Sequence, residues 1–191
     1  MTRLVLIGPI CSGKSTIAER LSDRLSLPNI PLDLVRWGYY YQIGYDRREE
    51  RRRVKAMGWR ARFDYWKPFE AYAVEQVLLD YPDTIIDFGA GHSVYEDDVL
   101  LARVQTAVKR ASHVVYLLPS PDIERSLDIL CARAEVPEDE RANFVALNRP
   151  FLEHPSNASL ATATFYTDGY SVDETCEQIA RILDSQAPPV S

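Results

Sequence analysis

The stretch Gly8-Pro9-Ile10-Cys11-Ser12-Gly13-Lys14-Ser15 decides the fold of this chain. It directly follows Leu4-Val5-Leu6-Ile7, a short apolar run that is typical of a buried parallel strand. Residues 15–27 come next and carry apolar side chains at helical spacing, which predicts a helix. Because strand, glycine-bearing loop and helix occur in the order that the G-x-x-x-x-G-K-[ST] pattern requires, the stretch is predicted to bind phosphate.

The loop supplies the groups that would hold a nucleoside triphosphate. Its backbone N–H groups and the start of the following helix are expected to point at the phosphates. Lys14 is expected to bridge the β- and γ-phosphates, Ser15 to coordinate Mg²⁺, and Thr16 to donate near the α-phosphate. ATP and Mg²⁺ are therefore the expected cofactors. The predicted cofactor-binding residues of this loop are Gly8, Pro9, Ile10, Cys11, Ser12, Gly13, Lys14, Ser15 and Thr16.

Length and composition indicate an ordinary globular protein. The chain has 191 residues, enough for one domain with a good-sized core, and 46% of them are hydrophobic. A net charge of −6 argues against a nucleic-acid partner, and no apolar run approaches the length of about 20 residues that spans a bilayer. The chain enters its first strand at once, which leaves no room for a signal peptide. Three scattered cysteines suggest reduced thiols and a cytoplasmic protein, which we expect to be a monomer or a homodimer.

The rest of the chain alternates strands and helices, which predicts an α/β protein with a parallel sheet covered on both faces. Ser171 is predicted to cap the last helix, with Glu174 completing a capping box. A break in helical structure is expected at 155–157. The further strands are predicted at 29–33, 83–88, 113–118 and 163–167, and further helices at 69–79, 99–109, 122–133 and 141–154.

Two acidic residues end predicted strands. Asp33 stands at or just past the end of the second strand, where ligands of open α/β sheets bind, so it could accept a proton from a substrate hydroxyl. Alternatively, Asp33 caps a helix that starts at Leu34. Asp87 ends the third strand and is a candidate Mg²⁺ contact, direct or through water. Gly89-Ala90-Gly91 follows, and its glycines allow a ligand to approach the backbone closely.

Two insertions are candidates for covering a ligand. Residues 35–81 hold most of the aromatic side chains, which are either core or part of a cap over the site. Within them, the arginine run 47–53 is either a solvated helical face or a source of contacts to an anionic substrate. After the fourth strand, residues 134–139 resemble a mobile lid. Arg133 or Arg141 is either a surface arginine or one that reaches the transferring phosphate.

The phosphate loop, Asp33, Gly89-Ala90-Gly91 and Tyr166-Thr167-Asp168-Gly169 together resemble the shikimate kinase-like branch of phosphate-loop small-molecule kinases. The resemblance implies a three-layer α/β/α sandwich whose five parallel strands have the order 2-3-1-4-5. It further implies that residues 1–186 form a single domain with a substrate cap at about 34–81 and a lid at about 131–155. Adenine would lie near the lid and near Asp168 and Gly169. Residues 187–191 are expected to be a disordered tail.

The same resemblance assigns an acceptor site, with departures from the family pattern. Asp33 would contact the substrate hydroxyls and help to deprotonate the acceptor, while Pro31 replaces the first aspartate of the family's pair. In the family, an arginine of the cap helix binds the shikimate carboxylate. Lys67 is the nearest match to that arginine in this sequence, although lysine lacks the bidentate fork of arginine. The family has a second carboxylate-binding arginine beyond the lid, and the nearest residues to that position in this sequence are Arg149 and His154. These departures argue against shikimate itself.

The sequence therefore predicts an ATP- and Mg²⁺-dependent phosphotransferase that acts on a hydroxyl group of a small metabolite. Two alternatives remain: a nucleoside monophosphate kinase, and a non-catalytic regulator that binds ATP. The predicted catalytic residues are Lys14, Asp33 and Arg133. The predicted substrate-binding residues are Asp33, Lys67, Gly89, Ala90, Gly91 and His154. The predicted metal contacts are Ser15 and Asp87.

Overall fold

A computed structural model describes residues 1–184 of the chain. The predicted tail at 187–191 lies outside the described residues. The strands are β1 (Thr2–Ile7), β2 (Asn29–Pro31), β3 (Ile85–Asp87), β4 (Ala111–Leu118) and β5 (Ala163–Tyr166). The helices are α1 (Lys14–Leu25), α2 (Leu32–Gln42), α3 (Arg47–Met57), α4 (Ala61–Asp80), α5 (Asp98–Val108), α6 (Ile123–Arg133), α7 (Arg141–Glu153), α8 (Pro155–Leu160) and α9 (Val172–Asp184), with a short 3₁₀ helix η1 at Ala90–Ser93.

The five strands form one parallel sheet in the order β2-β3-β1-β4-β5, which confirms the predicted fold class and strand order. In the register of this sheet, Leu6 of β1 lies opposite Asp87 of β3 and Val115 of β4. The phosphate loop leaves the central strand at this edge. Because parallel strands all end at one edge, the loops that follow β1, β2 and β3 meet there.

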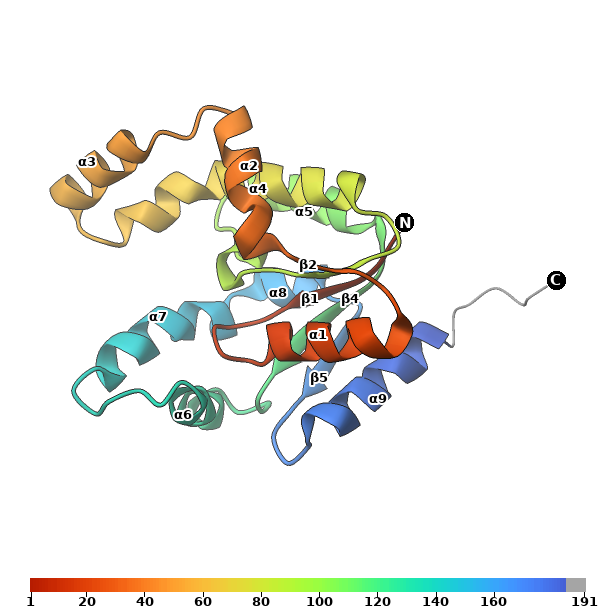
Figure 1. The fold of residues 1–191 in the computed structure, drawn as a ribbon. Coiled ribbons are helices and arrows are strands. Elements are labelled where there is room, and N and C mark those ends of the chain that lie inside the picture. Colours follow the sequence, from red (N-terminus) through yellow and green to blue (C-terminus); the bar gives the residue numbers. More distant parts are fainter. Residues whose placement is uncertain (185–191) are drawn as a thin grey trace.

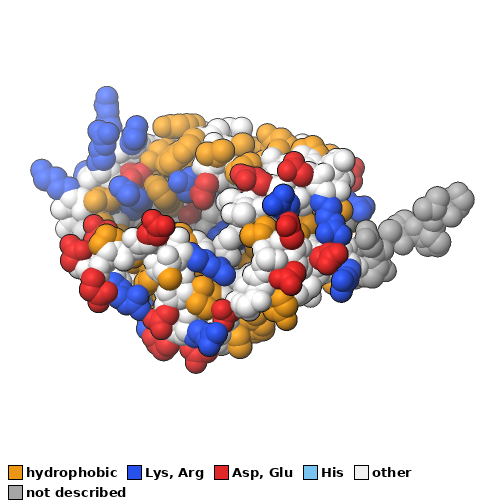
Figure 2. All heavy atoms as spheres, turned by 60° about the horizontal axis from the view of Figure 1, so that its bottom comes forward, with side chains coloured by type: hydrophobic (Ala, Val, Ile, Leu, Met, Phe, Trp, Pro, Cys, Tyr) orange, Lys and Arg blue, Asp and Glu red, His pale blue; other side chains and the backbone are white. Residues whose placement is uncertain are grey.

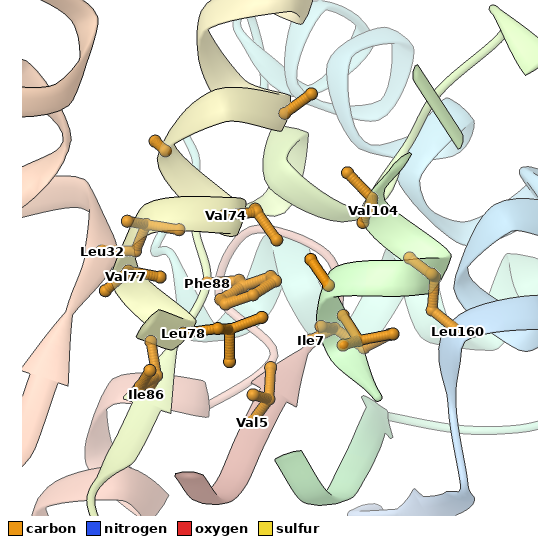
Figure 3. Packing of buried hydrophobic residues seen from close by; sticks show 14 of the residues in the cluster. Val5, Ile7, Leu32, Val74, Val77, Leu78, Ile86, Phe88, Val104 and Leu160 are labelled. Atoms are coloured by element: carbon orange, nitrogen blue, oxygen red, sulfur yellow. The ribbon is translucent and has the colours of Figure 1, made fainter. Parts of the chain in front are cut away.

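Alternation along the strands builds two cores. Leu4 and Leu6 of β1 pack with α1 and α9 on one face, whereas Val5 and Ile7 pack with helices on the other face. Figure 1 shows α1 and α9 together below the sheet and α4 and α5 above it. Figure 3 shows the second core, where α2, α4, α5 and α8 contribute Leu32, Val74, Val77, Leu78, Val104 and Leu160. Burial of each such side chain stabilises the fold by about 1.5–3 kcal/mol.

The second strand is shorter than the sequence predicted, and this places Asp33 differently. β2 ends at Pro31, which lacks an N–H for further pairing, and α2 begins at Leu32. Asp33 therefore lies in the first turn of α2 and not at its cap, which is Pro31. A carboxylate in the first turn still interacts favourably with the helix dipole.

Helical structure extends further than predicted at two places. α4 starts at Ala61 and continues through Pro68, although this proline removes one helix hydrogen bond. The break expected at 155–157 is wrong, because Pro155 occupies the first turn of α8, where its missing N–H costs nothing. By contrast, the capping box is confirmed, since the amide of Glu174 donates to Ser171 and the amide of Ser171 donates to the Glu174 carboxylate.

The insertion after β2 projects beyond the sheet. α3 and the first half of α4 extend past the carboxyl edge of the strands, and α7 extends on the same side (Figure 1). In α3, Glu49 forms ion pairs with Arg52 and Arg53, as predicted for a solvated helical face. Glu50 is instead buried. None of the helices in residues 1–184 is both long enough and apolar enough to cross a membrane.

Candidate active site

The phosphate loop holds Lys14 in a buried position between β1 and α1. The Lys14 ammonium donates to the carbonyl oxygens of Gly8 at 3.0 Å and Pro9 at 2.7 Å. Burial lowers the pKa of Lys14 to about 8, and the negative charges of Asp87 and Asp33 oppose this shift. Lys14, Asp33 and Asp87 therefore share one electrostatic environment at the end of the sheet. Phosphates entering the loop would replace the two carbonyl groups as partners of the ammonium.

Ser15 at the start of α1 meets Asp87 at the end of β3. The Ser15 hydroxyl donates to Asp87 Oδ2 at 2.7 Å, while Asp87 Oδ1 is buried with no hydrogen-bond partner among the described residues. Burial raises the pKa of Asp87, and the Ser15 hydrogen bond and Lys14 partly offset this effect. A hydroxyl and a carboxylate are hard oxygen donors that suit Mg²⁺, which takes its other ligands from phosphates and water. The two residues fit the predicted metal contacts.

A cavity of about 550 Å³ continues from the loop along α1. Loop residues from Cys11 to Thr16 form one wall, and Thr167 and Tyr170 form another. The Arg133 guanidinium closes the space between them, since it donates to Ser12 O at 3.4 Å and to Thr167 Oγ1 at 3.0 Å. This volume falls within the range of small-molecule and cofactor sites. Arg133 thus lies beside the phosphate loop, as its predicted role requires.

The predicted nucleotide contacts after β5 lie next to this cavity. The Asp168 carboxylate accepts from Arg125 Nε at 2.7 Å, and Gly169 has φ +81°, a left-handed value that suits glycine. Asp168 is therefore paired with α6, while its neighbours Thr167 and Tyr170 face the cavity. Arg141, the other candidate lid arginine, instead pairs with Asp128.

Asp33 lies against the glycine loop that follows β3. A Cβ placed on Gly89 would overlap both carboxylate oxygens of Asp33, so glycine is required there for the two to approach. The Asp33 carboxylate also accepts from Arg36 at 2.9 Å, one helical turn further along α2. The Asp33 side chain is 53% exposed despite these contacts. It can therefore meet a substrate hydroxyl at the mouth of the site.

Lys67 and Glu70 of α4 form a second charged pair beside the same loop. Lys67 Nζ donates to Glu70 Oε2 at 2.7 Å and to Gly91 O at 2.9 Å. Glu70 is 2% exposed, and a Cβ on Gly91 would overlap its carboxylate. The predicted substrate residues Lys67, Gly89, Ala90 and Gly91 are thus brought together with Asp33 around η1. Lys67 is already paired with a buried carboxylate, whereas a lysine that binds a substrate carboxylate would have no such partner.

Sequence reasoning missed three residues of this region. Asn148 of α7 is fully buried, and its Oδ1 accepts from the phosphate-loop amide of Ile10 at 2.9 Å. Its Nδ2 has no hydrogen-bond partner among the described residues. Arg36 and Glu70 were also missed. Their only sequence signal is a position three residues after Asp33 and Lys67, which places each pair on one helix face.

The predicted contact at His154 lies apart from these groups. Its ring caps α8, where Nδ1 accepts from the amide of Ser156 at 3.2 Å. Arg149 forms ion pairs with Glu124 and Glu153. No contact between these two residues and the glycine loop is seen in residues 1–184, so their acceptor role stays a prediction.

Comparisons with known proteins agree with this architecture. No protein-family model matches the chain, and no curated protein sequence matches it. The structure is similar to shikimate kinase from Acinetobacter baumannii, with a TM-score of 0.66, 17% identity and coverage of 97% of this chain and 95% of that one. It is also similar to shikimate kinase from Aquifex aeolicus, with a TM-score of 0.57, 19% identity and 97% of both chains covered.

A third similar structure is a gluconokinase from Sinorhizobium meliloti, with a TM-score of 0.60, 15% identity and coverage of 96% of this chain and 94% of that one. At such identities the similarity establishes the fold. This chain has the strand order β2-β3-β1-β4-β5, a phosphate loop on the central strand and an insertion after β2, and these features together define its architecture. The chain therefore has the shikimate kinase-like fold of the phosphate-loop proteins.

Proposed function

We propose that the protein transfers the γ-phosphoryl group of ATP to a hydroxyl group of a small metabolite, with Mg²⁺ as cofactor. The observation that carries this proposal is the meeting of Asp33 and Gly89 beside Lys14 and the Ser15–Asp87 pair. A phosphate loop alone would equally suit a switch protein. An exposed carboxylate beside that loop adds a group that can accept a proton from an attacking hydroxyl.

In the proposed reaction, the acceptor oxygen forms a bond to the γ-phosphorus while the bond between that phosphorus and the β–γ bridging oxygen breaks, which releases ADP. Asp33 orients the hydroxyl and takes its proton. Lys14 and Arg133 lie where they would neutralise charge on the phosphates. Mg²⁺ would be held by Ser15 and Asp87 and would supply charge neutralisation. Catalysis then depends on positioning and electrostatics.

Incubation of the protein with γ-labelled ATP and a fractionated small-molecule extract tests the proposal. We expect label in one hydroxylated metabolite with the wild-type protein and none with Lys14→Ala. Circular dichroism of the variant establishes that it is folded. Label transfer by folded Lys14→Ala would contradict the assignment of the loop.

The two alternatives give different results in the same assay. Label in a nucleoside diphosphate would identify a nucleoside monophosphate kinase. ATP binding without label in any fraction would favour a regulator that binds ATP without catalysis. Spiking the extract with shikimate and gluconate tests the acceptors that the names of the similar structures suggest.

A further inference from the structure

A cavity of about 170 Å³ lies between the start of α4 and α7, on the acceptor side of the site. Most of its wall is apolar, with Phe63 of α4, Val94 after η1, and Leu147 and Phe151 of α7 among the lining residues. Trp59 forms part of the rim and is 50% exposed. Such a wall suits a ligand with an aromatic or other apolar body.

The cavity adjoins the groups that would carry out phosphoryl transfer. Lys67 lines it and also donates to Gly91 O in the loop that contacts Asp33. On the opposite wall, Leu147 precedes Asn148, whose side chain accepts from the phosphate-loop amide of Ile10. A molecule in this cavity would therefore contact Lys67, which bonds the glycine loop, and the part of α7 that precedes the residue bonded to the phosphate loop.

The charged side chains that line the cavity differ in whether another residue of the protein already neutralises them. The lining includes the cations Arg60 and Lys67 and the anions Asp64 and Glu96. Lys67 is neutralised by Glu70, which is buried behind it. Asp64 and Glu96 are exposed, and no hydrogen bond or ion pair to another described residue engages either side chain.

Arg60 is the remaining cation of the lining, and it lies over the ring of Trp59 with its guanidinium carbon 5.3 Å from the ring centroid. It also donates to Ala146 O at 3.5 Å. With Glu70 included, the anions around the cavity exceed the cations by one. Arg60 is the lining cation to which a carboxylate-bearing ligand could bind, but such a ligand would also approach two unpaired carboxylates, whereas an ammonium group would be attracted to both.

From this arrangement we infer that the acceptor is a hydroxylated amine with an apolar or aromatic body. The body fills the cavity between α4 and α7, the ammonium group lies near Asp64 and Glu96, and the hydroxyl extends toward Asp33. This inference rests on the proposed function, because it identifies the class of molecule that receives the phosphoryl group. It excludes hydroxy acids as preferred acceptors.

Three probes that share one phenyl carbinol test the inference. They are 2-amino-1-phenylethanol, its N-acetyl derivative, and 3-hydroxy-3-phenylpropanoate, which place an ammonium, a neutral amide and a carboxylate at the same position. Affinity is measured by calorimetry with Mg²⁺ and a non-hydrolysable ATP analogue bound. We expect the amine to bind about 10-fold more tightly than the carboxylate, with the amide between them.

Charge-neutral variants show whether the two carboxylates cause this preference. Asp64→Asn/Glu96→Gln should reduce the preference for the amine to within about 2-fold and leave affinity for the N-acetyl probe unchanged. Glu19→Gln/Asp23→Asn is the matched control, because it changes net charge equally on the exposed face of α1, away from the cavity. This control should retain the full preference.

Equal binding of the amine and the carboxylate, tighter binding of the carboxylate, or binding of neither would overturn the inference. So would a preference for the amine that survives in Asp64→Asn/Glu96→Gln. The proposed function fails separately, if folded wild-type protein binds ATP yet labels no metabolite of the extract. Label transfer to a hydroxy acid would thus reject the acceptor class and keep the kinase.

Discussion

Two side chains at the centre of the site press against backbone atoms. Asp33 lies against the Cα of Gly89, and the ammonium of Lys14 lies against the carbonyl groups of Gly8 and Pro9. In each case the position of a charge depends on the space left by a neighbouring main chain. Small changes at this scale should therefore alter function with little effect on folding.

Gly89→Ala should lower kcat/KM by about 10- to 100-fold, because the new methyl group displaces the Asp33 carboxylate. Steady-state kinetics with the identified acceptor measures the loss. Gly38→Ala is the control, since its Cβ meets no atom within 4 Å and it lies inside α2. It should keep full activity and gain about 0.5–1 kcal/mol of stability. Full activity of Gly89→Ala would show that the position of Asp33 is unimportant.

The affinity for ATP should fall as the pH rises through about 8, because burial lowers the pKa of Lys14 to about 8 and phosphates bind its charged form. Titrations with ATP between pH 7 and 9.5 measure this effect, and Lys14→Arg should show no such decline. The same shift lets the ligand-free protein gain stability as the pH rises from about 8 toward 10.5, since the unfolded chain holds that proton more tightly. A pH-independent affinity would contradict this assignment.

At the scale of elements, buried polar groups join α3 to α4 within the insertion after β2 and join α7 to the phosphate loop. Glu50 of α3 accepts from Arg62 Nε at 2.7 Å, from Trp66 Nε1 at 3.1 Å and from the hydroxyl of Tyr45. Burial would raise the pKa of Glu50, but these three donors together hold it below its ordinary value. One buried carboxylate thus accepts from the segment before α3 and from two residues of α4.

Glu50→Ala should lower the free energy of unfolding by about 1–3 kcal/mol, because the indole N–H of Trp66 and the Arg62 guanidinium lose their common acceptor. Urea denaturation measures this change. Glu49→Ala is the matched control and should have a smaller effect, since Glu49 pairs only with exposed arginines on the surface of α3. Equal losses in the two variants would show that Glu50 has no special structural role.

Asn148→Ala should lower kcat/KM for ATP by about 10-fold, because the amide of Ile10 loses its acceptor and the phosphate loop loses its link to α7. The effect should lie in both the dissociation constant of ATP and kcat. Asn143→Ala, on an exposed part of the same helix, is the control and should behave like the wild type. An unchanged Asn148→Ala would mean that α7 does not position the loop.

At the scale of the whole molecule, the site lies at one edge of a sheet that two cores hold from opposite faces. Basic side chains project at the end of the molecule where α3 lies, as Figure 2 shows, while both signs of charge cover the remaining part of that view. The cavity of about 550 Å³ beside the phosphate loop joins α1, α6 and the loop before α9, which come from both halves of the chain. A bound nucleotide should therefore stabilise the domain as a whole.

ATP with Mg²⁺ should raise the midpoint of thermal unfolding by about 5–10 °C at a concentration 100 times the dissociation constant. This ligand excess contributes about 2.7 kcal/mol, and 1 kcal/mol shifts the midpoint by about 2–4 °C in a protein of this size. Thermal unfolding followed by circular dichroism measures the shift, and Lys14→Ala should reduce it strongly. A comparable shift in Lys14→Ala would place the nucleotide outside the phosphate loop.

The sequence by itself determined the phosphate loop and the parallel sheet, whereas the strand order was implied by the resemblance to shikimate kinase-like kinases. The loop and the sheet follow from local patterns: an apolar strand, a glycine loop and a capped helix have signals that lie within a few residues of one another. The boundaries of β2 and the existence of α8 were harder to predict. Pro31 and Pro155 each fit more than one local structure, and tertiary packing decides among them.

Only the tertiary structure decided which charges remain free to meet a substrate. Lys67 is a cation in the sequence, but the buried Glu70 neutralises it, and Asn148 reaches Ile10 from a position 138 residues away. Such pairings depend on how α4 and α7 pack against the sheet, which no local pattern encodes. Electrostatic interactions act between atoms that are close in space, so the chemistry of the acceptor site emerges only after the chain has folded.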